Sequence, residues 1–423
     1  MSKRRVETDR ILKFGGTALG DAAAVRRAVR ATRKRLGEQG RGAVVVSASA
    51  GVTDVLEAAA GAAAGGSADA EERVDRVTRR YRALLEAVTS RREAETVSPR
   101  LDRLERGLRR AVRSARDEER CGPALRDEIL SFGERMCAPV MAAALRSAGV
   151  DAEGRTARRL IRTDDEFGAA RLDRRRTERA VRRQLAERSA VQVVPGFVGE
   201  SRSEHTTTLG RGGSDFTAVA LGASLDVNRV EIFTDVAGVM TADPAITGEA
   251  GRLARVSWKE MWVLSSLGAE VVQPRAVSLA MQASVPLRVA HFARPDEDGT
   301  LVAAAGEESP KAVIGVTATD LEDARSPGRR DRLLRRLLGR LAIDEDRIAE
   351  LAVVGVVGAG DGEHTAGSIE GHLREASLSA EARGHGPART VLFVVPAAEK
   401  DRAVATIHSA LFDAATVEPA RRR

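Results

Sequence analysis

The sequence predicts an α/β protein with a mostly parallel central sheet, followed by a smaller α+β domain. Short, continuously apolar segments alternate along the chain with longer segments of helical periodicity. Glycine- or hydroxyl-rich turns follow the apolar segments, and the composition shifts near residues 296–310, where Gly, Glu, Ser and Pro indicate a linker. Alternating strands and helices joined by such turns are typical of a parallel sheet covered by helices.

The first strands and helices follow in this order from the N-terminus. Residues 10–14 and 43–46 are apolar strand segments that run into Gly15 and Ser47, and residues 22–36 between them carry one apolar helical face. The remaining strands expected in this sheet share the same apolar character and cover residues 190–198, 229–233 and 285–289.

Residues 67–120 predict a helical insert in the first domain. The periodicity indicates two amphipathic helices, the second beginning at Ser98 with Pro99 at its first helical position. A further helix is expected over residues 127–147. We interpret the inserted pair as packing elements that carry no chemistry.

The first domain is expected over residues 1–300 and the second over residues 301–423. The second shows strand patterns and helical patterns in an order that suggests a small α+β module. Its expected strands are residues 312–317, 351–357 and 390–395, and its expected helices are residues 367–377 and 402–411. Nothing in this module resembles a catalytic site.

Composition and charge narrow the classes of partner. The net charge is +7, but the arginines lie among acidic residues on predicted helices and only 3% of residues are aromatic, so we expect no nucleic-acid partner. Cys121 and Cys137 have neither metal-ligand nor disulfide-framework spacing. With no apolar leader and no segment of membrane-spanning length, the sequence predicts a soluble, cytoplasmic protein without a membrane partner.

A glycine-rich stretch at residues 206–216 is the most informative motif. It combines glycines, several hydroxyls, Arg211 and Asp215 directly before an apolar run. A helix starting near Asp215 would offer free N–H groups and a positive dipole end to an anion. The alternative is an ordinary turn in which Ser214 or Asp215 caps the helix. A second strand that ends in Gly15 and Gly16 favours a phosphate-handling enzyme.

Together, several separated blocks resemble the aspartate kinases of the amino-acid kinase superfamily. The likeness runs from Ile11 to Val289 in the family's order, and the helical pair resembles the family's subclass with a longer insert. The blocks are residues 13–17, 47–53, 133–136, 207–215, 234–239 and 241–244.

This resemblance implies transfer of the ATP γ-phosphoryl group to the β-carboxylate of L-aspartate, which gives 4-phospho-L-aspartate. That is the first step of lysine, threonine and methionine biosynthesis, or of a related specialised pathway. A carboxylate is already nucleophilic at neutral pH, so catalysis consists of positioning and charge neutralisation. ATP and Mg²⁺ are the implied cofactors, with Mg²⁺ bound through the phosphates and no direct metal ligand.

The resemblance also implies roles on the aspartate side. Glu134 would meet the α-ammonium group, and Arg211 would clamp a carboxylate with its planar guanidinium. The alternative for Glu134 is a solvent-facing helix glutamate. The implied pocket-lining residues are Ser47, Thr53, Phe197 and Ser214.

On the phosphate side, Lys13 would lie against the phosphates while Gly15 and Gly16 donate N–H groups. Asp215 would orient Lys13 or organise the metal and phosphates. The alternative for Lys13 is a strand-end lysine that extends into solvent. The nucleotide-binding residues implied by the resemblance are Lys13, Gly16, Thr234, Asp235, Gly238, Met240 and Asp243.

The chain departs from the family pattern mainly on the nucleotide side. Glu270 stands where the family has a lysine, and this reverses a charge near the transferring group. The other departures are Ala18 for serine, Met240 for tyrosine, Ala245 for arginine and Gln273 for histidine.

Two readings follow from these departures. In the first, nucleotide binding is rearranged and Arg252, Arg255 or Arg275 supplies the missing charge. In the second, the chain is a weak or inactive paralogue that binds aspartate or an effector and serves as a regulatory subunit. A kinase for another amino acid is a lesser option, because Glu134 and Arg211 are retained.

Aspartate kinases usually carry two ACT modules that bind lysine or threonine. Residues 351–411 resemble the second of these, whereas the first is reduced to a strand at residues 312–317 and a helix at residues 326–341. This reduction favours loss of feedback inhibition. The resemblance implies a homodimer formed through the ACT-like domain, since such modules pair their sheets to cover edge strands.

Overall fold

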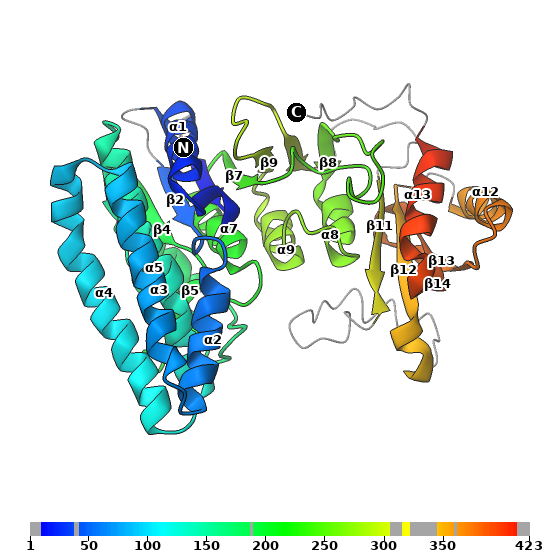
Figure 1. Cartoon of the computed structure of the whole chain (residues 1–423). Helices are drawn as coiled ribbons and strands as arrows, with labels where there is room; N and C mark the ends of the chain where they lie inside the picture. Colours follow the sequence, from blue (N-terminus) through cyan, green and yellow to red (C-terminus); the bar gives the residue numbers. More distant parts are fainter. Residues whose placement is uncertain are drawn as a thin grey trace. The chain divides into compact units, whose positions relative to one another are not determined.

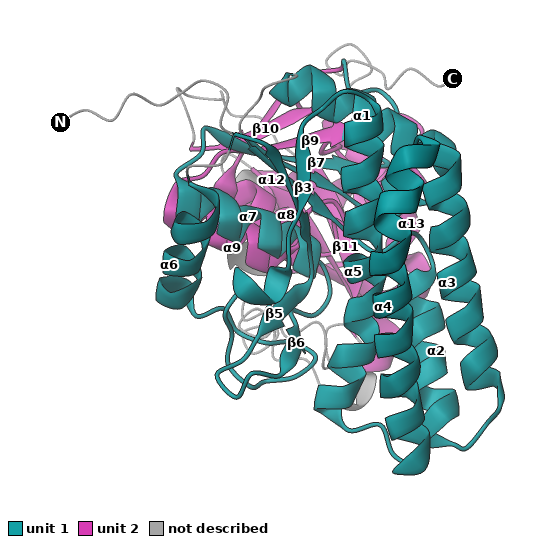
Figure 2. Ribbon diagram, turned by 90° about the vertical axis from the view of Figure 1, so that its left-hand side faces the viewer, with its two compact units in different colours: residues 1–235, 291–296 teal, residues 236–290, 297–423 magenta. Residues whose placement is uncertain are grey.

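The computed structural model describes residues 10–37, 42–186, 189–304, 315–321, 345–358 and 362–412. The chain divides into two compact units, coloured separately in Figure 2. Unit 1 comprises residues 1–235 and 291–296, and unit 2 comprises residues 236–290 and 297–423. The expected boundary at residue 300 therefore differs from this division, which groups residues 236–290 with the C-terminal module.

The sheet of unit 1 is parallel throughout, and its strands lie in the order β3-β4-β2-β1-β7. The register pairs Phe14 with both Val46 and Phe233, and Val46 with Pro195. The carboxyl ends of these strands therefore meet at one edge. The strands are β1 (Arg10–Phe14), β2 (Gly42–Val46), β3 (Ala152–Gly154), β4 (Val191–Pro195) and β7 (Arg229–Thr234).

Helices surround this sheet, and α2 to α5 form the long helical assembly seen in Figures 1 and 2. Asp21 begins the first helix, because its side chain accepts a hydrogen bond from the N–H of Ala24. The helices are α1 (Ala22–Leu36), α2 (Val52–Ala64), α3 (Asp69–Val88), α4 (Arg91–Asp117), α5 (Pro123–Ser147), α6 (Arg174–Leu185) and α7 (Gly213–Leu225), and a small ribbon is formed by β5 (Val198–Glu200) and β6 (Thr206–Thr208).

The predicted start of the second inserted helix was wrong. Helix α4 begins at Arg91 rather than at Ser98, because Ser90 caps it with a side chain that accepts from the N–H of Glu93. Pro99 therefore lies inside the helix. The hydroxyl of Ser98 bonds back to the Ala94 carbonyl, 2.8 Å away, as serine does within a helix.

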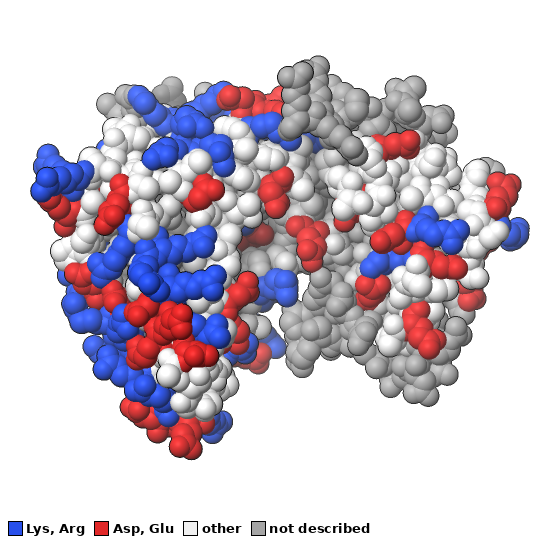
Figure 3. Space-filling model, in the orientation of Figure 1, with Lys and Arg blue, Asp and Glu red and all other residues white. Residues whose placement is uncertain are grey.

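The positive charge of the inserted helices is paired locally. Arg109 on α4 lies 2.8 Å from Glu105 on the same helix, and 3.0 and 2.5 Å from Glu71 and Asp75 on α3. Figure 3 shows basic and acidic side chains interleaved over this part of unit 1. The four residues are half-buried and form one charge network that joins α3 to α4.

In unit 2, one set of strands lies in the order β9-β10-β8. Strand β10 falls within the linker expected at residues 296–310, so that prediction was wrong over residues 300–303; residues 305–310 lie outside the described part. Buried and half-buried residues alternate along β10, as is typical of a strand. The polar residues around this short segment made it resemble a linker in the sequence. The elements are β8 (Arg255–Ser257), α8 (Trp258–Ser266), α9 (Pro274–Ala283), β9 (Leu287–His291) and β10 (Thr300–Ala303).

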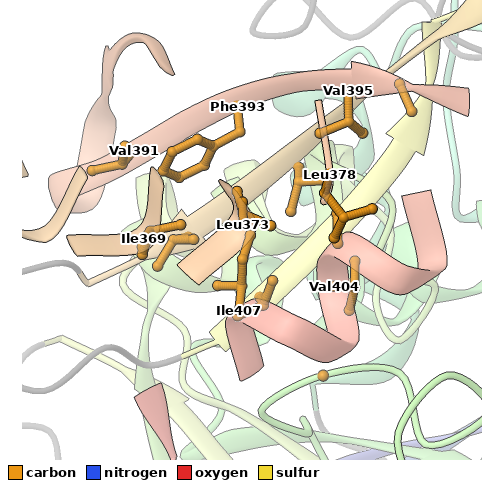
Figure 4. Close-up of a cluster of buried hydrophobic side chains, with 14 of the residues drawn as sticks. Ile369, Leu373, Leu378, Val391, Phe393, Val395, Val404 and Ile407 are labelled. Atoms are coloured by element: carbon orange, nitrogen blue, oxygen red, sulfur yellow. The ribbon is translucent and has the colours of Figure 1, made fainter. Parts of the chain in front are cut away.

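The C-terminal module of unit 2 is an antiparallel sheet in the order β11-β12-β14-β13. Its helices pack against one face, where Phe393 of β14 lies among Ile369, Leu373, Val404 and Ile407 (Figure 4). The helix expected at residues 326–341 lies outside the described residues. The elements are β11 (Gly315–Asp320), β12 (Leu351–Val357), α12 (Gly362–Glu375), β13 (Glu381–Gly386), β14 (Thr390–Pro396) and α13 (Lys400–Leu411).

The predicted fold class is confirmed: an α/β unit with a parallel sheet and a β-rich C-terminal module that is consistent with an ACT-like domain. In the described part of the chain, no helix combines the length and the apolar character needed to cross a bilayer.

Candidate active site

The carboxyl edge of the unit 1 sheet brings several predicted site residues together. Backbone hydrogen bonds continue the strand pairing past the strand ends, from Ser47 N–H to the Phe14 carbonyl (3.2 Å) and from Gly196 N–H to the Val46 carbonyl (2.8 Å). Ligands of open α/β sheets bind at this edge. Lys13, Ser47 and Thr234 thus lie on neighbouring strand ends of one sheet.

Lys13 forms an ion pair with Asp215. The Nζ atom lies 2.6 Å from the Asp215 Oδ1 atom, and the side chains are 12% and 8% exposed. Lys13 therefore does not extend into solvent, and the alternative reading of that residue was wrong. Asp215 lies in the first turn of α7, where the helix N-terminus presents its N–H groups, so a fixed cation and a helix dipole coincide.

Helix α7 begins differently from the alternative that made Ser214 or Asp215 its cap. The N-cap residue is Gly212, whose φ of 65° lies in the left-handed region, and no side chain caps the helix. Glycine adopts this conformation without the penalty of a Cβ atom. The N–H groups of the first turn therefore donate no hydrogen bond to a capping side chain.

Glu134 is a buried acid at the centre of α5. Only 4% of it is exposed, and burial raises its pKa to about 8 although the N–H of Ala48 bonds to the carboxylate. Among the described residues, its Oε2 atom has no hydrogen-bond partner. The solvent-facing alternative was therefore wrong. A buried carboxylate with one unpaired oxygen is suited to a ligand that brings a positive charge.

Ala48 joins this acid to the turn that follows β1. Its N–H bonds to Glu134, while its carbonyl oxygen lies 3.0 Å from the place where a Cβ atom on Gly16 would be. A Cβ atom on Gly15 would in turn lie 3.4 Å from the Lys13 ammonium. The glycine turn, the lysine and the acid are therefore close neighbours in unit 1.

Tyr81, the only tyrosine in the sequence, connects the insert to this site. It is fully buried on α3; its hydroxyl donates to the Gly133 carbonyl (2.8 Å) and accepts from the Ser49 N–H (3.0 Å). A Cβ atom on Gly133 would come within 2.7 Å of the Ala48 Cβ atom, so α5 approaches the β2–α2 turn as only glycine permits. The insert therefore contacts the predicted site through one buried side chain, and this contact is structural, as expected of a packing element.

Asp127, two turns before Glu134 on α5, supports the glycine-rich stretch. Its carboxylate accepts from the N–H groups of Gly168 (2.9 Å) and Thr208 (2.7 Å) and from the Thr208 hydroxyl (2.8 Å). Burial nevertheless raises its pKa. The sequence carried no signal for Tyr81 or Asp127, because periodicity indicates burial but not which distant polar group a side chain meets.

Phe197, Arg211 and Ser214, three of the remaining aspartate-side residues, lie at the start of α7. Arg211 is exposed and makes no ion pair within the described part of the chain, whereas Ser214 is buried. Phe197 adopts a φ of 65° and its N–H donates to the Thr217 hydroxyl (3.1 Å). Such a conformation in a bulky residue stores strain that is common at functional sites. Thr53 lies in the first turn of α2.

The predicted nucleotide residues are distributed over both units. Thr234 is the last residue of β7 in unit 1 and Asp235 follows it, with 3.0 Å between the Thr234 Oγ1 and Asp235 Oδ1 atoms. Gly238, Met240 and Asp243 lie in unit 2, as does Glu270 between α8 and α9. No cluster of three metal-ligating side chains occurs among the described residues.

The amino acid kinase family model matches residues 10–291. The chain belongs to the amino acid kinase family. Among curated members, the lysine-sensitive aspartokinase 3 of Escherichia coli K12 is 32% identical over 314 residues, or 71% of this chain and 65% of that protein. Aspartokinase 1 of Bacillus subtilis 168 is 44% identical over 181 residues, or 43% of this chain and 44% of that protein. The match thus spans less than two thirds of either relative.

Solved structures of this family agree over nearly the whole chain. E. coli aspartokinase III in complex with lysine and aspartate (T-state) has a TM-score of 0.75 and 26% identity, covering 96% of this chain and 100% of that one. The same enzyme with aspartate and ADP (R-state) has a TM-score of 0.77 at 24% identity, with equal coverage, and shares the fold. The resemblance to aspartate kinases is confirmed.

Proposed function

We propose that the protein is an aspartate kinase that transfers the γ-phosphoryl group of ATP to the β-carboxylate of L-aspartate. The observation that carries this proposal is the arrangement of Lys13, Asp215 and Glu134: a paired cation at a helix N-terminus and a buried acid whose Oε2 atom has no partner in the part of the chain that the structure describes. The aspartokinase relatives, and the E. coli enzyme solved with aspartate and ADP, support both substrates.

Each residue has a defined task in the proposed reaction. Glu134, once ionised, pairs with the α-ammonium of aspartate, and exposed Arg211 receives a substrate carboxylate. The β-carboxylate oxygen forms a bond to the γ-phosphorus as the bond from that phosphorus to the bridging oxygen breaks and ADP leaves. Lys13 neutralises the negative charge of the transferring group, and Asp215 holds the Lys13 ammonium in place.

Mg²⁺ is proposed as a companion of ATP. Mg²⁺ is commonly held by one or two carboxylates together with substrate phosphates, and it lowers the charge that the attacking carboxylate meets. Asp215, beside Lys13 at the start of α7, is the carboxylate that would organise the metal and the phosphates in this mode.

A second candidate function rests on Glu270. A carboxylate where the family has lysine favours a chain that binds aspartate or an effector and serves as a regulatory subunit with weak or no transfer. The intact Lys13–Asp215 pair opposes this candidate.

An aspartyl-hydroxamate assay tests the proposal. The purified protein is incubated with L-aspartate, Mg-ATP and hydroxylamine, which traps an acyl phosphate. Hydroxamate from the wild type and none from a folded Lys13→Ala variant is the expected result. No product from folded wild type over a range of enzyme and substrate concentrations would overturn the catalytic proposal for aspartate and favour the regulatory candidate.

Assembly and setting are further proposals. Strands β11 and β13 lie at the two edges of the described module sheet, and pairing of such edges between two copies would give the expected homodimer. The lysine-sensitive relative supports a place in lysine biosynthesis, and the cytoplasm is the proposed location.

A further inference from the structure

The loop that carries Met240 and Asp243 is anchored to the C-terminal module by a buried side-chain hydrogen bond. In this loop, between β7 and β8, the Thr241 Oγ1 atom lies 2.9 Å from the Nε2 atom of His408 on α13. Thr241 is 3% exposed and His408 is fully buried. Residues 167 positions apart in sequence thus meet inside unit 2.

Thr241 makes hydrogen bonds through both its side chain and its backbone. Its hydroxyl accepts from the Gly251 N–H (2.9 Å) and shares a further hydrogen bond with His408 Nε2, in which the donor depends on the tautomer of the imidazole. The Thr241 N–H donates to the Gly251 carbonyl (2.9 Å), and the Thr241 carbonyl accepts from Val316 of β11 (2.8 Å). Thr241 therefore closes the loop upon itself and binds it to both a helix and a strand of the module.

Apolar contacts strengthen the same attachment. Ala242 and Ala250 of the loop are buried members of the module's own hydrophobic cluster, together with Val404 and Ile407 of α13. Met240 and Ile246 pack against that cluster. The loop thus contributes side chains to the core of the module rather than lying on its surface.

The opposite face of the module sheet holds the segment that leads to Glu270. Ala352, Val354 and Val356 of β12 belong to the cluster beneath the helices, so Gly355 faces the other way. There, a Cβ atom on Gly355 would lie 2.3 Å from the Leu267 side chain, just after α8. The Thr317 hydroxyl also donates to the Leu267 carbonyl (3.4 Å). One sheet therefore contacts both segments on which the family pattern is altered.

We propose that the C-terminal module is a structural support for nucleotide binding in this chain, with His408 as the positioning residue that acts through Thr241. The inference rests on the proposed function, in which Met240 and Asp243 contact the nucleotide. It assigns the module a permanent task that requires no amino-acid effector, since the contact consists of the chain's own buried groups.

Equilibrium binding of Mg-ADP and of L-aspartate, each measured by titration calorimetry on the full chain, tests the proposal. His408→Ala removes the imidazole, and we expect Mg-ADP affinity to fall about tenfold because the buried Thr241 hydroxyl loses one of its two hydrogen-bond partners. Aspartate affinity is expected to stay within about twofold, as for distant sites that do not interact. His408→Gln, which can place an acceptor near the Nε2 position, is expected to restore most of the affinity.

A second pair of variants tests the same bond from the loop. Thr241→Val removes the hydroxyl at nearly constant volume, whereas Thr241→Ser retains it; only the first should weaken Mg-ADP binding. His372→Ala on α12 is the matched control, because His372 is a half-exposed histidine of the same module. If His408→Ala does not fold, this pair decides the question.

The outcomes separate the inference from the proposed function. Wild type that binds no Mg-ADP overturns both. Wild type that binds Mg-ADP, with unchanged affinity in folded His408→Ala and Thr241→Val, overturns the inference alone. An equal loss of affinity for Mg-ADP and aspartate also overturns it, because it would indicate general destabilisation instead of support for one loop.

Discussion

The aspartate-side residues and the loops assigned to the nucleotide side differ in what supports them. In unit 1, Glu134 and the start of the glycine-rich stretch are held by buried polar groups on neighbouring helices, above all Tyr81 and Asp127. In unit 2, the loop around Thr241 and the segment after Leu267 are held by the C-terminal module. The departures from the family pattern at Met240, Ala245, Glu270 and Gln273 all fall in the second region.

Loss of Lys13 should give the largest loss of activity. It should lower kcat without acting selectively on the aspartate side or the nucleotide side. Lys13→Ala removes the cation that neutralises the transferring group, so we expect kcat to fall by about 10³-fold, the upper range for removal of one such group. Single-turnover kinetics measure this directly. Thermal unfolding serves as the control, because Asp215 is then left buried without its partner. A folded variant with near-normal kcat would remove Lys13 from the mechanism.

Glu134→Gln should act on aspartate alone. The substitution preserves shape but removes the charge that pairs with the substrate ammonium, and we expect the KM for aspartate to rise about 100-fold, in line with the loss of one partner of a buried charge pair. The KM for Mg-ATP is expected to change little. Steady-state kinetics with each substrate varied in turn provide the check, and an equal rise in both KM values would contradict the assignment.

The pKa of Glu134 predicts how stability depends on pH without substrate. Its folded pKa of about 8 lies above the unfolded value of roughly 4.3. Protonated Glu134 therefore stabilises the fold fully below the unfolded pKa, and this contribution is lost as the pH rises towards 8. We expect Glu134→Gln to match wild type near the lower end of this window and to have the higher melting temperature near its upper end. Identical pH profiles would refute this.

Tyr81→Phe should weaken the aspartate side more mildly. Removal of the hydroxyl leaves the Ser49 N–H without this acceptor, and we expect the KM for aspartate to rise about five- to tenfold, with kcat and the KM for Mg-ATP nearly constant. Arg80→Lys, which alters the neighbouring contact to the Ser49 hydroxyl, offers a comparison on the same helix. A larger change in the KM for Mg-ATP than in the KM for aspartate would contradict the assignment of Tyr81 to the aspartate side.

Glu270→Lys should have the smallest effect and the opposite sign. The change restores the cation found in the family, and we expect the KM for Mg-ATP to fall about two- to fivefold, the size of a contact at an exposed charge. Glu270→Gln distinguishes loss of the carboxylate from gain of the ammonium. If neither variant improves nucleotide affinity, Glu270 does not limit binding.

The sequence predicted what depends on local pattern. Strand β1 and helix α1 have the expected bounds, and Lys13 and Asp215, which two separate motif blocks contain, form an ion pair. The start of α4 was wrong because Ser98 and Pro99 imitate a helix start, while the true cap is Ser90. Strand β10 was missed because its polar, glycine-containing surroundings are those of a linker.

The supporting residues could not be predicted for a different reason. Tyr81 bonds to Gly133, 52 positions away, and Thr241 to His408, 167 positions away. Tyr81 and His408 lie on the apolar faces of helices, and Thr241 lies in a loop. Periodicity indicates that such a residue is buried, but it does not indicate which residue it contacts. The identity of a buried polar partner is a property of the packed chain, and hydrogen-bonding potential must be satisfied somewhere.

The aromatic content gives the two regions separate optical signals. The chain has one tyrosine and two tryptophans. Tyr81 lies in unit 1, and Trp258 and Trp262 both lie on α8 of unit 2, where the Trp258 indole donates to the Val285 carbonyl (3.2 Å). Tryptophan emission excited at the red edge of its absorption therefore reports on unit 2 alone, and near-ultraviolet tyrosine difference absorbance reports on the Ser49–Gly133 contact. The unlabelled protein thus carries a native spectroscopic probe in each region.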